Sequence, residues 1–358
     1  MRILAVTNLY VTPKVPALGT YVEQQIKGLK EVGLKVDVLF LDRAQRGIGV
    51  YFSLASRVRS GIKEYKPDLV HVMYGGIMAD LVTRAARDIP TVVTFHGSDV
   101  LGQHLAGPIR EAIAEFGVRC SIRAAQRASG IIAVSKSLVD ALPQSVNRSK
   151  VRVIPCGIDL SRFQPLDQDA CRRRLGWAPE RFHILFSGST DPVKRPWLAH
   201  AAVEKLRQFG IDGEIHYLRG IRNDEVPIWL NASHVVLLTS SHEGSPTIVK
   251  EALACNLPVV SVNVGDVADR MEGIDGCHIA SPEASDLATK LHMVRTANRR
   301  IAGRAKIETL SLRSIALEIK TLYGDILQSS NPSTRYSCVP EPRENHGAVS
   351  SCDTQRQS

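Results

Sequence analysis

Two carboxylates, Glu243 and Glu251, flank a Gly-Ser-Pro-Thr sequence whose residue types suit the binding of an anion. Ser245 is a preferred N-cap type and Pro246 fits the first helical position, so a helix is predicted to begin here. The free N–H groups and the positive dipole end of such a helix attract phosphate. With a carboxylate on each side, the sequence suits a ligand that carries both phosphates and hydroxyls, such as a sugar nucleotide. A simpler alternative is a capped surface helix with two solvated glutamates.

The elements that must position these residues follow an alternating pattern. Strand-like apolar runs alternate with helical patterns, which predicts an α/β fold with parallel sheets. The expected strands of the first half are 3–7, 35–41, 69–73, 91–95, 130–134 and 151–154. Those of the second half are 183–186, 215–218, 235–238, 259–262 and 277–279.

A Pro- and Gly-containing sequence at 153–159 separates the two halves, each large enough for its own doubly wound sheet. We therefore expect two Rossmann-like domains, 1–157 and 158–311, that face each other across a cleft, with ligands near the carboxyl ends of the strands. A helix at about 312–327 is expected to pack back onto the first domain. The polar segment 328–358 lacks apolar periodicity and is expected to be disordered.

Composition narrows the partners and the compartment. The formal charge of +9 favours anionic partners, but aromatic residues make up only 5% and no nucleic-acid-binding module is evident. No apolar run approaches the ~20 residues that span a bilayer, and the amino terminus has the pattern of a first strand and not of a signal peptide. We expect a cytoplasmic protein. The seven cysteines show no C-x-x-C pair or Cys/His ligand spacing, so no structural metal is predicted.

One segment, 51–66, has an apolar face interrupted by basic residues. A basic amphipathic helix of this kind can lie on an anionic membrane surface. The alternative is an ordinary helix that packs on the sheet and leaves its basic face in water.

Several spaced motifs point to one family. The stretch from Glu243 to Glu251 has the Glu-x7-Glu form, followed by the apolar strand 257–262, and the sequence His-Gly-Ser-Asp follows the expected strand 91–95. The join at 153–165 and the stretch 231–240 add further matches. Together these motifs resemble the retaining glycosyltransferases of family 4 over about residues 1–325. The resemblance implies the two-domain fold of the second glycosyltransferase type, GT-B, with most donor contacts in the second half.

The resemblance also implies roles for the opening motif. Glu243 is expected beside the transferred sugar, and Glu251 is expected to hold the ribose hydroxyls. The diphosphate is expected to meet the backbone N–H groups that follow Gly244, in the segment Ser245, Pro246 and Thr247.

Positive charge for the leaving diphosphate is expected from Lys194. In the family an arginine usually follows the preceding strand, whereas this chain has Gly188-Ser189 there. Gly188 is still expected to approach the donor. Arg195 or Lys250 could supply the second positive charge, and spacing alone does not decide between them. The alternative for the basic pair at 194–195 is a solvated face before a helix.

On the first domain, His96 is expected at a strand end, facing the cleft near the donor sugar, although a histidine there is often only structural. Asp99 is expected either to orient the acceptor or to cap the following helix. Gly19 permits close approach of the backbone, and the adjacent helix start could meet phosphate.

The sequence thus predicts a retaining glycosyltransferase that uses a UDP- or GDP-linked sugar and a glycan or lipid-linked acceptor, in polysaccharide biosynthesis, with possible attachment to an anionic membrane surface. No Asp-x-Asp motif is present, so no metal is expected and no cofactor beyond the donor. No dedicated nucleophile is evident, and the leaving phosphate is expected to assist the acceptor hydroxyl. The alternatives are a soluble transferase that makes a small glycoside, and a catalytically silent sugar-nucleotide-binding subunit.

Overall fold

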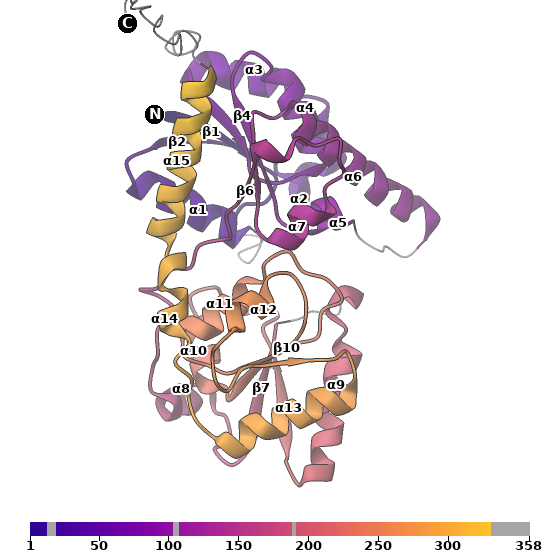
Figure 1. Cartoon of the computed structure of the whole chain (residues 1–358), viewed down its shortest axis with the longest axis vertical. Coiled ribbons are helices and arrows are strands. Elements are labelled where there is room, and N and C mark those ends of the chain that lie inside the picture. Colours follow the sequence, from indigo (N-terminus) through magenta and orange to yellow (C-terminus); the bar gives the residue numbers. More distant parts are fainter. Residues whose placement is uncertain (13–18, 103–106, 188–190, 331–358) are drawn as a thin grey trace, which may run out of the picture.

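The computed structural model describes residues 1–12, 19–102, 107–187 and 191–330. Two parallel sheets, each covered by helices, form the two halves of the chain (Figure 1). The expected GT-B-type α/β architecture is therefore confirmed. The limits of the two domains stay a prediction, and the tail from 331 onward lies outside the described residues.

The first sheet has the strand order β2-β1-β3-β4-β5-β6, and the second has β11-β10-β9-β7-β8. The strands of the first sheet are β1 (Arg2–Thr7), β2 (Lys35–Phe40), β3 (Leu69–Val72), β4 (Thr91–Phe95), β5 (Gly130–Ala133) and β6 (Val151–Val153). Those of the second are β7 (Phe182–Phe186), β8 (Gly213–Tyr217), β9 (Val235–Leu238), β10 (Val259–Val262) and β11 (His278–Ala280). Each expected strand is present, with its ends shifted by two residues at most.

The helices alternate with these strands. Those of the first half are α1 (Thr20–Glu31), α2 (Arg43–Arg46), η1 (Gly47–Tyr51), α3 (Leu54–Tyr65), α4 (Gly76–Ala85), α5 (Ser98–Leu101), α6 (Pro108–Arg127), α7 (Lys136–Ala141) and η2 (Arg148–Lys150). Those of the second half are α8 (Gln168–Leu175), η3 (Pro192–Lys194), α9 (Pro196–Leu206), η4 (Arg207–Phe209), α10 (Val226–Ala232), α11 (Thr247–Ala254), α12 (Val267–Met271), α13 (Ala284–Ala297), α14 (Arg304–Ile307) and η5 (Glu308–Leu310). The last helix is α15 (Leu312–Ser330).

Alternate residues of β1 serve two separate cores. Ile3 and Ala5 pack with the buried face of α1, whereas Leu4 and Val6 pack with α3 and α4. Both faces of the strand are apolar because helices cover both faces of a doubly wound parallel sheet. This burial holds the carboxyl ends of the strands, where the site lies, in a fixed position.

Helix α15 packs against α1 in the first half of the chain (Figure 1). Gly28 of α1 allows the close approach, because a Cβ there would lie 3.0 Å from the Leu312 carbonyl oxygen. The buried Tyr323 hydroxyl lies 2.6 Å from His71 Nδ1 on β3. Residues 328–330, expected to be part of a disordered tail, continue this helix.

Helix α3, within the segment 51–66, packs on the first sheet. Leu54 and Val58 are fully buried, and the Arg57 guanidinium donates to the carbonyl oxygen of Phe40. The apolar face of α3 thus packs into the core, as expected for an ordinary helix that lies on the sheet. None of the helices in the described part of the chain combines the length and apolarity that a membrane crossing requires.

Candidate active site

A cavity of about 310 Å³ lies at the carboxyl ends of strands from both sheets, where the two halves meet. Doubly wound folds bind ligands at this position. The first half lines it with Leu9, Tyr21, Tyr74, His96, Ser98 and Val134. Cys156, Ser187, Lys194, Glu243, Gly244, Ser245, Pro246, Thr247 and Ile248 complete the lining.

Lys194 and Glu243 form an ion pair in this cavity. Lys194 Nζ lies 2.5 Å from Glu243 Oε1, and the two side chains are 27% and 15% exposed. The Asp191 carboxylate accepts from the backbone N–H of Val193 and begins the short helix η3, which ends at Lys194. The Thr239 hydroxyl donates to the Lys194 carbonyl oxygen at 2.7 Å. These hydrogen bonds fix the backbone at Lys194, so that its ammonium and the Glu243 carboxylate lie together in the cavity.

Gly244 lies against the backbone of the opposite half. An added Cβ would come 1.8 Å from the His96 carbonyl oxygen, so no larger residue fits. Gly265 also lies close to this backbone, with a φ of +59° and an added Cβ only 2.6 Å from the Gly244 carbonyl oxygen. The glycine in the motif thus allows the two halves to touch directly beside the cavity.

Helix α11 begins one residue later than predicted. Pro246 is its N-cap and Thr247 its first residue, whereas Ser245 was expected to cap it. The Ser245 hydroxyl donates instead to Asp266 Oδ2 at 2.7 Å, an oxygen that also accepts from Arg270 Nε at 2.8 Å. This buried carboxylate takes the hydroxyl away from the helix end. No side chain of the described residues caps α11, and its first residues, Thr247 and Ile248, line the cavity.

His96 also lines the cavity and is neutral near pH 7. Burial, aided by the nearby Lys250 ammonium, lowers the pKa of His96 to about 4, although a hydrogen bond to the Met73 carbonyl opposes the shift. Its Nε2 lies 3.0 Å from that carbonyl oxygen, so Nε2 carries the hydrogen and Nδ1 the lone pair. Cys156 Sγ lies 3.7 Å from Nδ1, and the Tyr21 ring centroid lies 4.5 Å from the imidazole.

Asp99 fixes the loop that presents His96. Its carboxylate accepts from the backbone N–H groups of His96 at 3.0 Å, Gly97 at 2.8 Å and Gly75 at 3.0 Å. Burial raises the pKa of Asp99 to about 6 against these hydrogen bonds. Asp99 is only 4% exposed and is not among the cavity-lining residues, so its role in the structure is to anchor the loop.

The two candidates for the second positive charge have different surroundings. Arg195 donates through Nε to the Thr239 carbonyl at 2.5 Å and through its second amino group to the Ser240 carbonyl at 2.9 Å, and it does not line the cavity. Lys250 is fully buried, and its Nζ donates to the Cys156 carbonyl oxygen at 3.2 Å. Burial lowers the pKa of Lys250. The Lys250 ammonium thus lies against Cys156, a residue between the two halves that also lines the cavity.

Glu251 lies one turn into α11, partly buried and outside the cavity-lining set. Burial raises the pKa of Glu251 to about 7, although the charges of Arg162 and Lys250 oppose the shift. Two buried nitrogens of Arg162, Nε and a terminal amino nitrogen, have no hydrogen-bond partner among the described residues. A carboxylate and unpaired donors beside the amino-terminal half of α11 suit hydroxyl groups such as those of a nucleoside.

Gly19 and Gly188 are the two glycines outside the opening motif that were predicted to contact the donor. Gly19 has a left-handed φ of 77°, and a Cβ there would lie 2.4 Å from the Leu9 carbonyl carbon. It thus packs the start of α1 against the segment that carries Leu9 to the cavity. Gly188 and Ser189 lie outside the described residues.

Sequence reasoning missed Tyr74 and Asp266. Tyr74 follows β3 and hydrogen-bonds the Ser98 hydroxyl at 2.7 Å, and Asp266 follows β10. A polar residue in the loop that follows a parallel strand is the signal that could have found both.

Comparison with known proteins gives the class and then the family. Residues 18–162 match the model for Glycosyltransferase Family 4, and residues 168–295 match that for Glycosyl transferases group 1. With its two facing sheets and the cavity between them, the chain is a GT-B glycosyltransferase. It belongs to the family 4 glycosyltransferases.

Individual relatives agree with this assignment. A protein of Bacillus subtilis named as a teichuronic acid biosynthesis glycosyltransferase, TuaC, is 28% identical, with 75% of this chain and 82% of that one covered. A D-inositol 3-phosphate glycosyltransferase of Pseudarthrobacter chlorophenolicus is 24% identical over 91% of this chain and 98% of that one.

Solved structures share the fold. A sucrose-phosphate synthase from Thermosynechococcus elongatus has a TM-score of 0.76 at 16% identity, with 92% of this chain and all of that one covered. Anabaena Alr3699/HepE in complex with UDP and glucose has a TM-score of 0.67 at 18% identity, with 91% of this chain and all of that one covered.

Proposed function

We propose that this glycosyltransferase retains anomeric configuration, needs no metal, and moves a sugar from a nucleoside-diphosphate donor to a hydroxyl of a glycan or lipid-linked acceptor. The observation that carries the proposal is the Lys194–Glu243 pair beside the amino end of α11, in one cavity with His96. It combines positive charge for a diphosphate with a carboxylate for sugar hydroxyls.

In the proposed reaction the bond between the anomeric carbon and the diphosphate oxygen breaks, and the acceptor oxygen bonds to the same face of the sugar. The acceptor proton passes to the leaving phosphate. Lys194 and the N–H groups at the start of α11 stabilise the charge that develops on the diphosphate. Glu243 orients the sugar hydroxyls, and neutral His96 can accept a hydrogen bond from the sugar through Nδ1.

Lys250 is the proposed second cation. Two nitrogens of Arg195 donate to backbone carbonyls, which keeps that guanidinium at the end of β9. The Lys250 ammonium is buried behind the cavity wall, close enough to lower the pKa of His96. Because little water screens a buried charge, Lys250 can stabilise the diphosphate without touching it.

The donor nucleotide is proposed to be uridine or guanosine diphosphate, with Glu251 on the ribose hydroxyls. The Anabaena neighbour was solved with UDP, which supports uridine. A thermal-shift screen with UDP, GDP and ADP decides between the bases, because a ligand of the folded state raises the melting temperature.

The acceptor is proposed to lie at the cytosolic face of an anionic membrane, in the synthesis of an envelope polysaccharide. The amino-terminal turns of α6 carry Ile109, Ile113 and Phe116 on one stripe, 77%, 59% and 46% exposed. Helix α6 packs against α5, whose Ser98 lines the cavity, so a membrane bound at this stripe would be near the site. The net charge of +9 suits anionic lipid.

Two measurements test the proposal. Release of nucleoside diphosphate from a sugar nucleotide, with the anomeric configuration of the product read by NMR, tests donor class and stereochemistry. An inverted product, or release that requires added Mg²⁺ or Mn²⁺, would contradict it. Co-sedimentation with vesicles of anionic lipid tests the acceptor location, and Ile113→Glu should weaken it. A chain that does not sediment at low salt would favour the soluble transferase of small glycosides.

A further inference from the structure

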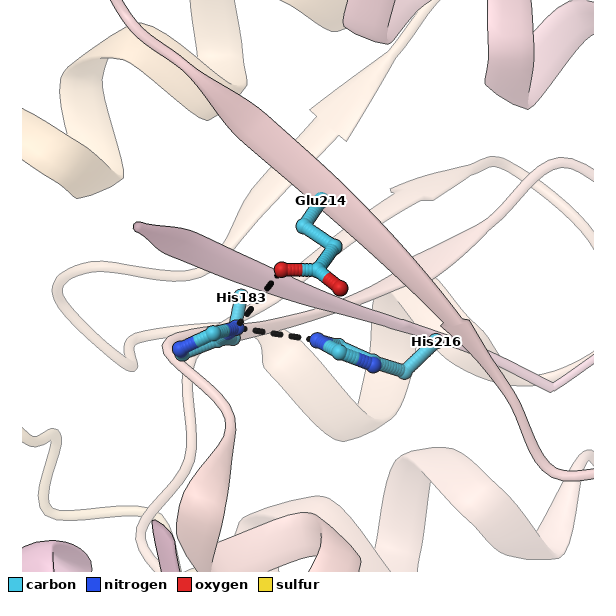
Figure 2. Close-up of side chains that lie close together, drawn as sticks. All are labelled: His183, Glu214 and His216. Atoms are coloured by element: carbon cyan, nitrogen blue, oxygen red, sulfur yellow. Dashed lines mark hydrogen bonds and ion pairs between the residues drawn. The ribbon is translucent and has the colours of Figure 1, made fainter. Parts of the chain in front are cut away.

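Two histidines and a glutamate lie close together on neighbouring strands of the second sheet (Figure 2). His183 lies on β7, and Glu214 and His216 lie on the neighbouring edge strand β8. His183 pairs with Glu214 in the parallel register, and residues two apart on a strand share a face. One ligand atom from each side chain lies within 4.8 Å of the other two.

The hydrogen bonds of His183 leave its lone pair directed into the cluster. His183 is fully buried, and its Nε2 lies 2.7 Å from the carbonyl oxygen of Ala178. A carbonyl only accepts, so Nε2 carries the hydrogen and Nδ1 the lone pair. Histidines that bind metals in proteins commonly donate their second ring N–H to a backbone carbonyl in this way.

The other two side chains face that lone pair. The His216 Nε2–H donates to His183 Nδ1 at 2.9 Å, and Glu214 Oε2 lies 3.9 Å from that nitrogen. For His216 Nε2 to bind a metal, the His216 hydrogen must move to its Nδ1. The ring of His216 stacks on Trp177 with centroids 3.5 Å apart and planes 9° apart, which fixes its direction. The Glu214 side chain is 39% exposed, so an ion can reach the cluster from solvent.

We propose that His183 Nδ1, His216 Nε2 and a carboxylate oxygen of Glu214 bind one divalent ion of the zinc class. Two imidazoles and one carboxylate suit Zn²⁺, whereas Mg²⁺ and Ca²⁺ prefer oxygen ligands throughout. With bonds of about 2.1 Å, tetrahedral ligand atoms are about 3.4 Å apart. The two contacts of His183 then need to change by about 0.5 Å each, and a water can fill the fourth position.

The position of the cluster separates this ion from sugar transfer. His183 precedes the cavity-lining Ser187 along the chain, about 13 Å away at strand spacing. An ion here joins the edge strand β8 to β7 and stabilises the second half of the chain. The two histidines are 33 positions apart in the chain. The prediction of no structural metal depended on short ligand spacings, which cannot detect a pair so far apart.

The test uses the full chain, treated with a chelator and then titrated with ZnCl₂ by calorimetry and thermal shift. We expect one Zn²⁺ per chain and a rise in melting temperature that equal MgCl₂ does not give. His216→Phe keeps an aromatic ring against Trp177 but removes the lone pair, and it should abolish this binding. His292→Phe, a histidine of α13 outside the cluster, should leave it unchanged.

Glu214→Gln provides a second variant with nearly the original shape, in which the affinity for Zn²⁺ should fall by about tenfold or more. X-ray absorption of the bound zinc should show nitrogen and oxygen neighbours with imidazole scattering and no sulfur. Absence of stoichiometric binding, equal affinity in His216→Phe, or sulfur neighbours from cysteines would each overturn the proposal.

Discussion

Among the described residues, Lys194 is the cation that lines the cavity beside Glu243, and its replacement by alanine removes that charge. A unit charge about 4 Å from a developing phosphate charge contributes about 4 kcal/mol at an effective dielectric constant of about 20. Because the lysine is 27% exposed, solvent screening reduces this to about 3 kcal/mol. Since about 1.4 kcal/mol corresponds to a factor of ten, kcat should fall about 100-fold.

The assay is the initial rate of nucleoside diphosphate release at saturating donor. Lys63→Ala, an exposed lysine of α3, serves as the control and should keep the wild-type rate. Thermal melting checks the fold, because loss of Lys194 leaves the largely buried Glu243 carboxylate without its partner. A folded Lys194→Ala protein with a kcat within about threefold of wild type would refute the assignment of this lysine to the leaving group.

Three further changes test other parts of the structure. Gly244→Ala inserts a Cβ against the backbone across the cleft and should abolish transfer and lower the melting temperature, whereas Gly324→Ala, with open space around it, should not. The raised pKa of Glu251, about 7, means that the carboxyl is protonated below pH 7 and ionised above it, so the donor KM should fall as pH rises through 7 in the wild type but not in Glu251→Gln. Tyr323→Phe leaves the buried His71 Nδ1 without its partner and should reduce the free energy of unfolding by about 1–3 kcal/mol, measured by urea denaturation.

Local patterns predicted the elements but not all of their ends. Strands such as β4 and β9 were predicted to the residue, because an apolar run buried on both faces has clear limits. The start of α11 was displaced by one residue because Asp266, distant in sequence, takes the Ser245 hydroxyl. The sequence left two interpretations of α3 open, a helix on a membrane surface or a helix packed on the sheet. Periodicity shows that a helix has an apolar face but not what covers that face.

The sequence by itself determined the family, the α/β class and the residue types that suit a sugar nucleotide, because these follow from local periodicity and from motifs that are contiguous in the chain. Only the tertiary structure decided which cation faces the cavity. Lys194 lies on its surface, Lys250 is buried behind it, and Arg195 is held by strand-end carbonyls. The tertiary structure alone also brought His183 and His216 together. These outcomes depend on contacts between residues far apart in the chain, and burial and charge at such contacts are set only when the sheets and helices pack.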